Sequence, residues 1–131
     1  MKTVGEYYRE RVLSLPKRQL RKVQLLHSPE NLRIEKDLFG WKLFYTRFGR
    51  NTEYFMECHS EEEARYLKTL FELGMSEVRV PKDEVYLKSI LPELERIKNK
   101  LDEILNSYME TLVSRKIKER LKSEVYMEII K

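Results

Sequence analysis

The sequence predicts an α+β fold, in which a small, mainly antiparallel sheet packs on helices. Two observations predict it. Residues 31–58 are rich in β-branched and aromatic residues that alternate with polar ones, which is typical of strands. Residues 83–131 instead repeat apolar residues every three or four positions, which is typical of helices. At 131 residues the chain fits one domain, 1–131, that is long enough to bury a core.

The first part of the chain, residues 1–30, is predicted to be a basic helical segment. A short helix is expected over residues 4–13. A second helix is expected over 16–27, with Pro16 in its first turn, where proline is well tolerated. One side of this second helix would carry four cations: Lys17, Arg18, Arg21 and Lys22.

The region 31–81 is predicted to hold the β-rich core. Three strands, 32–38, 41–48 and 53–58, would form a meander, with turns marked by Gly40 and by Gly49-Arg50-Asn51-Thr52. We expect a tight second turn on Arg50-Asn51, which places residue 48 opposite Glu53.

A helix over residues 60–73 and a fourth short strand over 77–81 follow the meander. Ser60 and Glu63 have the spacing of a capping box, which satisfies free amides at a helix start. Ala64, Leu67, Leu70 and Phe71 would form its buried stripe, and Gly74 suits the residue just beyond a helix end.

The last region, 83–131, is predicted to form long helices that pair as a helical hairpin or as a dimerising bundle. Apolar residues step by four and three from Leu87 onward, as in a heptad seam. The partner helix would be residues 114–130 of the same chain or a second subunit. The predicted dimerisation residues are Leu94, Ile97, Leu101, Ile104 and Tyr108.

The aromatic hairpin 41–58 has two different faces, because side chains alternate along a strand. One face carries Trp41, Leu43, Tyr45, Tyr54, Met56 and Cys58 and is predicted to be core. The other face places Phe44, Phe48 and Phe55 among charged residues. Three interpretations stay open for it: a covering layer of helix, an exposed platform that stacks nucleic-acid bases, or a surface covered by a protein partner.

Charge is unevenly distributed along the chain. Residues 1–59 carry twelve Lys and Arg against seven Asp and Glu, whereas residues 60–131 carry fourteen against fifteen. A local positive excess favours polyanions as partners. The predicted nucleic-acid-binding residues are Lys17, Arg18, Arg21, Lys22, Lys42, Phe44, Arg47, Arg50 and Phe55.

Enzymatic chemistry is not expected. Cys58 and His59 are strand neighbours that point to opposite faces, so no metal site is predicted. Glu35-Lys36-Asp37 is reminiscent of metal-dependent nucleases but lacks an upstream acidic partner, and no glycine-rich phosphate loop is present. We expect no cofactor, no small-molecule substrate and no catalytic residue.

The composition also bears on localisation and source. With no long apolar run and a Lys-, Arg- and Glu-rich composition, we expect a cytoplasmic protein that leans toward a thermophilic source.

Residues 32–72 are predicted to form three strands and then a helix whose first turn is acidic. This order is similar in outline to the three-stranded DNA-binding domains of the AP2 and integrase-arm type. That resemblance implies DNA binding. The helices followed by a hairpin also resemble, more distantly, a winged helix.

These observations together predict a small, non-enzymatic nucleic-acid-binding protein that uses a basic N-terminal helix and an aromatic, basic hairpin. The alternative is a protein-interaction or structural module that self-associates through its C-terminal helices.

Overall fold

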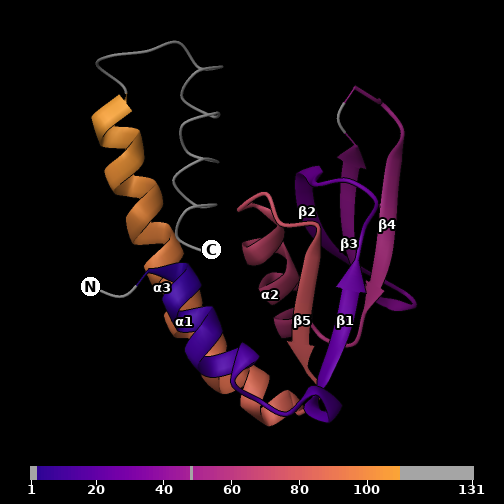
Figure 1. Cartoon of the computed structure of the whole chain (residues 1–131). Coiled ribbons are helices and arrows are strands. Elements are labelled where there is room, and N and C mark those ends of the chain that lie inside the picture. The colour runs from indigo at the N-terminus through magenta and orange to yellow at the C-terminus, as the bar shows by residue number, and fades with distance from the viewer. Residues whose placement is uncertain (1–2, 48, 110–131) are drawn as a thin grey trace.

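A three-stranded antiparallel meander forms the larger sheet. In the computed structural model, which describes residues 3–47 and 49–109, β2 (Pro29–Asp37), β3 (Gly40–Arg47) and β4 (Glu53–Cys58) lie side by side in that order (Figure 1). Thr46, rather than residue 48, lies opposite Glu53. The turn is thus longer than expected, but a shift of two residues leaves every side chain on its predicted face.

The fourth strand, β5 (Glu77–Pro81), belongs to a separate two-stranded sheet. It pairs antiparallel with β1 (Leu20–Gln24), and we call this pair the ribbon. The predicted helix over 16–27 is therefore wrong: Lys17–Gln19 form one 3-10 turn (η2), and β1 follows directly. The reason is long-range, because β5 has a buried face and needs a partner for its backbone groups, which outweighs a weak local helix preference.

In the rest of the described chain, helices lie where the sequence predicts them. α1 (Val4–Tyr8) continues into a π-helical turn, η1 (Arg9–Leu13), which covers the expected short helix. α2 (Glu61–Phe71) begins at Ser60, whose hydroxyl accepts a hydrogen bond from the amide of Glu63 at 3.1 Å. α3 (Glu84–Met109) runs through Pro92 without a break.

α2 lies at the centre of the molecule. It contacts β2, β3 and β5 on one side and α3 on the other, while α1 lies along α3 (Figure 1). The fully buried stripe of α2, which includes Ala64, Leu67 and Leu70, packs with Leu43 of β3 and Leu91 of α3. The helices of the described residues therefore cover one face of the three-stranded sheet.

Two tyrosines fix the middle of β5. The amide of Arg79 donates to the Tyr8 hydroxyl at 2.9 Å, and the carbonyl of Arg79 accepts from the Tyr66 hydroxyl at 2.7 Å. Burial raises the pKa of both tyrosines, which is the expected effect of a low-polarity environment on a phenol. The two hydrogen bonds hold Arg79 rigidly with its side chain on the outer face of the ribbon.

Some of the predicted dimerisation residues on α3 are buried in the core of this chain. Leu94 and Ile97 are each 1% exposed and belong to the core of this chain, so they are not free to contact a second chain. Leu101 is partly buried against that core, and Ile104 is 50% exposed. The side chain of Tyr108 and the predicted partner segment 114–130 lie outside the described residues.

Candidate nucleic-acid interface

The ribbon separates neighbouring residues onto opposite faces. Arg21 and Val23 share the inner face with Val78 and Val80, which are buried in the core. Lys22 lies directly opposite Arg79 in the ribbon, and both point outward, with side chains 46% and 40% exposed. A two-stranded ribbon of this kind is one of the two elements that fit the major groove of B-DNA.

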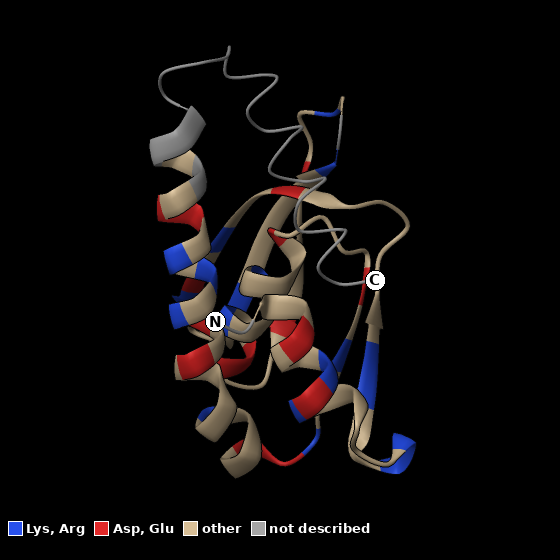
Figure 2. Cartoon of the chain, turned by 60° about the vertical axis from the view of Figure 1, so that its left-hand side comes forward, with Lys and Arg blue, Asp and Glu red and all other residues tan. Residues whose placement is uncertain are grey.

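Cations outnumber carboxylates around this ribbon. Blue segments gather on its strands and on the turn that precedes it (Figure 2). Glu77 lies 3.1 Å from Arg79 and 3.8 Å from Lys22, and Asp83 accepts from the amide of Val85 at the start of α3. We call this surface the basic ribbon; its cations are Lys17, Arg18, Lys22, Arg79 and Lys82, and its carboxylates are Glu77 and Asp83.

Arg21, a predicted contact residue, is engaged in an ion pair within the fold, although its side chain is 39% exposed. Its guanidinium donates to a carboxylate oxygen of Glu63 at 2.6 Å, and the Glu63 side chain is only 4% exposed. The loss of the predicted helix is the cause, because a strand turns Arg21 inward and Lys22 outward. Of the other three predicted N-terminal cations, Lys22 lies 3.8 Å from Glu77, whereas Lys17 and Arg18 have no ion pair with a residue that the structure describes.

The second predicted surface is the outer face of the three-stranded sheet, where Phe44 and Phe55 lie opposite each other. Their ring centroids are 5.8 Å apart, and Phe55 is 53% exposed. In the described part of the chain the helices lie on the other side of the sheet (Figure 1), so the interpretation of a covering helix layer is not supported there. Phe48, the third ring of the predicted platform, lies outside the described residues.

Cations on this sheet face are already engaged by the protein itself. The guanidinium of Arg33 lies 4.3 Å from the Phe44 ring centroid and donates to Glu53 at 2.7 Å. The Lys42 ammonium lies 4.8 Å from the Phe55 ring centroid and bonds Asp37, where this bond lowers the pKa of the carboxyl. With four carboxylates, Glu35, Asp37, Glu53 and Glu57, against Arg33 and Lys42, the sheet face carries no positive excess.

The two predicted cation sets do not converge. Arg47 and Arg50 lie at the turn between β3 and β4, and Arg47 stacks 4.5 Å from the Tyr54 ring centroid. Figure 1 places this turn at one end of the molecule and the start of β1, next to η2, at the other end. Arg47 and Arg50 therefore lie far from the N-terminal cations.

The turn between β2 and β3 carries the most exposed apolar residues of the described chain. Leu38 is 98% exposed and Phe39 is 87% exposed. The Lys42 ammonium lies 5.7 Å from the Phe39 ring centroid, so this turn and the Phe55 ring flank the same cation. Exposed apolar groups that adjoin in this way are typical of contact surfaces.

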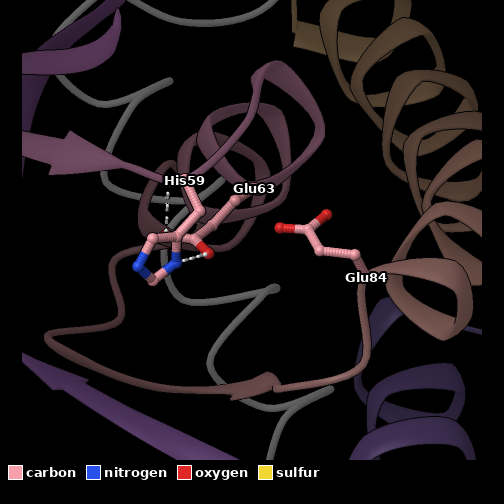
Figure 3. A group of neighbouring side chains, drawn as sticks. All are labelled: His59, Glu63 and Glu84. Carbon is pink, nitrogen blue, oxygen red and sulfur yellow. Dashed lines mark hydrogen bonds and ion pairs between the residues drawn. The ribbon is translucent and has the colours of Figure 1, made fainter. Parts of the chain in front are cut away.

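A third group of side chains joins the starts of α2 and α3 (Figure 3). His59, Glu63 and Glu84 place ligand-type atoms within 4.8 Å of one another. The carboxylate of Glu63 already binds Arg21 and the His59 ring, the latter at 2.9 Å, and the Ser60 hydroxyl donates to Glu84 at 3.2 Å. These bonds satisfy the group as a helix-capping network, and a metal ion on Glu63 would have to compete with them.

Cys58 lies on the inner face of the sheet, as predicted, and is partly buried against the core. Burial, helped by the negative charge of Glu63, raises the pKa of its thiol to about 11. Such a thiol is a poor nucleophile at neutral pH.

Sequence reasoning missed three residues of these surfaces: Arg33, Arg79 and Lys82. Arg79 follows from the alternation of Val78 and Val80, because a charged residue between two buried valines of a strand points outward. Arg33 carries the same signal, because it lies between Leu32 and Ile34 of a predicted strand, whereas Lys82, beyond the end of β5, has no comparable local signal. No family model, curated protein or solved structure matches this chain. Among the residues described, no helix has the length and apolar character needed to span a bilayer.

Proposed function

We propose that this protein binds nucleic acid through the basic ribbon. The observation that carries the proposal is the excess of five cations over two carboxylates on and beside an outward-facing two-stranded sheet. Of the carboxylates that the structure describes, Glu77 alone lies within ion-pair distance of Lys22 and Arg79, so the described surface keeps a positive excess for phosphate groups. The sheet face, although richer in aromatic rings, lacks that excess.

A double-stranded ligand fits this surface best. Side chains on the outer face of a strand repeat every two residues, roughly 7 Å apart, and the ribbon is narrow enough for a major groove. We expect about four phosphate contacts, which corresponds to a log–log salt slope of about −3.6 for a duplex. Phosphate contacts position a protein without reading sequence, so binding is expected to be largely independent of sequence.

The experiment compares two variants that each remove two positive charges. One is Lys22→Gln with Arg79→Gln on the basic ribbon, and the matched control is Arg33→Gln with Lys42→Gln on the sheet face. Fluorescence anisotropy with a labelled duplex, at low and moderate salt, measures the affinity. The ribbon variant should weaken binding and flatten the salt dependence, whereas the control should not. Equal losses in both variants, or no binding by the wild type at low salt, would contradict the proposal.

A protein-interaction role is the second candidate, and it rests on the sheet face. Leu38, Phe39 and Phe55 form an exposed apolar surface around Lys42. Sedimentation of the wild type and of Phe39→Glu at tens of micromolar tests whether this surface contacts a second copy. A dimer that this substitution dissociates would support the role, and both functions can coexist in one dimer.

A further inference from the structure

A pocket opens at the end of the basic ribbon, between η2 and the first turn of α3. Its volume is about 370 Å³, within the size range of small-molecule sites. Side chains of three kinds line it: apolar Leu15 and Pro81, the aromatic ring of Tyr86, and the charged groups of Arg18, Lys82 and Asp83.

Hydrogen bonds hold the walls of this pocket in place. The amide of Lys82 donates to the carbonyl of Gln19 at 2.9 Å, which ties the end of β5 to η2. The Tyr86 hydroxyl donates to the carbonyl of Arg11, and the Asp83 carboxylate accepts from the amide of Val85 at 2.9 Å. The pocket therefore exists before a ligand arrives, which reduces the ordering cost of binding.

The charges at the pocket have a clear asymmetry. Arg18 and Lys82 are exposed, and neither has a carboxylate within ion-pair distance among the residues that the structure describes. One oxygen of Asp83, in contrast, is occupied at the start of α3. Two free cations beside an apolar and aromatic wall suit a ligand with one anionic end and one flat, apolar end.

We propose that this pocket binds a single nucleotide, with its phosphate on Arg18 and Lys82 and its base against Tyr86. The inference rests on the proposed function and deepens it, because the pocket adjoins the basic ribbon that would hold the rest of the nucleic acid. The bound nucleotide is then the last one of a strand, or an unstacked one within it, because the base of such a nucleotide can stack on an aromatic ring. A free nucleoside monophosphate has the same chemistry.

The first test uses adenosine monophosphate, adenosine and inorganic phosphate as probes in titration calorimetry with the full chain. The monophosphate should bind more tightly than either part alone. Leu15→Trp, which fills the pocket without a change of charge, and Arg18→Gln should each weaken this binding about tenfold. Lys22→Gln with Arg79→Gln, outside the pocket, should leave it unchanged. Thermal unfolding shows that each variant is folded.

The second test compares a blunt duplex with a duplex that carries a 5′-phosphorylated overhang of one nucleotide. The wild type should prefer the overhang, and Leu15→Trp should lose the preference but keep the affinity for the blunt duplex. The proposal is overturned if the wild type binds no monophosphate at millimolar concentration, or if Leu15→Trp leaves monophosphate binding intact. Failure of the proposed function looks different: the duplex would not bind, while the monophosphate still would.

Discussion

The basic ribbon and the sheet face both carry cations, yet they differ in how many carboxylates those cations are paired with. On the sheet face, Arg33 and Lys42 each bind a carboxylate and lie over a phenylalanine ring. On the basic ribbon, Lys22 and Arg79 share one carboxylate, that of Glu77, and Arg18 and Lys82 make no ion pair with a described residue. A count of positive residues therefore does not identify a polyanion site, because the nearby carboxylates decide how much charge remains.

Within the ribbon the same contrast separates two neighbours in the sequence. Arg21 supports the fold by neutralising a buried carboxylate, whereas Lys22 faces solvent. The strand puts them on opposite sides, and a helix would have kept them together. The predictions below test these distinctions, beginning with the largest expected effect.

Arg21→Gln should lower the free energy of unfolding by about 2–3 kcal/mol, because it leaves the buried Glu63 carboxylate without its main cation. Lys22→Gln, the matched control one residue away, should change it by less than about 0.5 kcal/mol. Urea unfolding followed by circular dichroism measures both. If the two variants were equally stable, the assignment of the inner and outer faces of β1 would be wrong.

Cys58 should react with a thiol reagent about 100-fold more slowly in the native protein than in the unfolded protein at pH 8. The pKa of the native thiol is about 11, against an ordinary value of 9.0, so its thiolate fraction is about 100-fold smaller. The folded state holds the thiol proton more tightly than the unfolded state does. The contribution of this thiol to the free energy of unfolding is therefore fully present below about pH 9, and it is lost as the pH rises through about 11. Rapid native labelling at pH 8 would show that the inner face of the sheet is open.

Loss of Lys22 and Arg79 together should weaken duplex binding about tenfold at low salt and reduce the salt slope by about 1.8, the value for two phosphate contacts. Loss of Arg33 and Lys42 should change both quantities little. Anisotropy titrations at several salt concentrations measure the slopes. A larger loss from the sheet-face pair would reverse the comparison between the two surfaces.

Phe55→Ala should have the smallest effect, less than twofold on duplex affinity, because the ring lies on the sheet face and away from the basic ribbon. Its effect on a single-stranded oligonucleotide is the informative one. A loss of tenfold or more for single strands alone would mean that the Phe44–Phe55 pair stacks bases, despite the carboxylates around it.

Much of the fold could be predicted from the sequence because the signals are local. The alternation along β3 and β4 assigns the faces correctly, and even a register error of two residues keeps them. The cap at Ser60 needs only residues within one helical turn. β1 could not be found in this way, because its strand conformation depends on a partner, β5, more than fifty residues later.

The candidate site was predictable only in part, for the same reason. Lys17, Arg18 and Lys22 were identified from their charge, but the inward turn of Arg21 depends on β1 being a strand. The pairing of Lys42 with Asp37 across the turn between β2 and β3 depends on register. Such contacts decide which charges remain free, and they cannot be predicted from the identity of one residue alone.

The two tyrosines that hold the backbone of Arg79 have a consequence for cooperativity. An isolated two-stranded sheet in water frays readily, and its amides exchange with solvent quickly. Here the middle of β5 cannot open without separating from α1 through Tyr8 and from α2 through Tyr66. The amide of Arg79 is therefore expected to exchange only when the whole domain unfolds. The shape of the outer surface, and the spacing of the charges on it, is then as durable as the core itself.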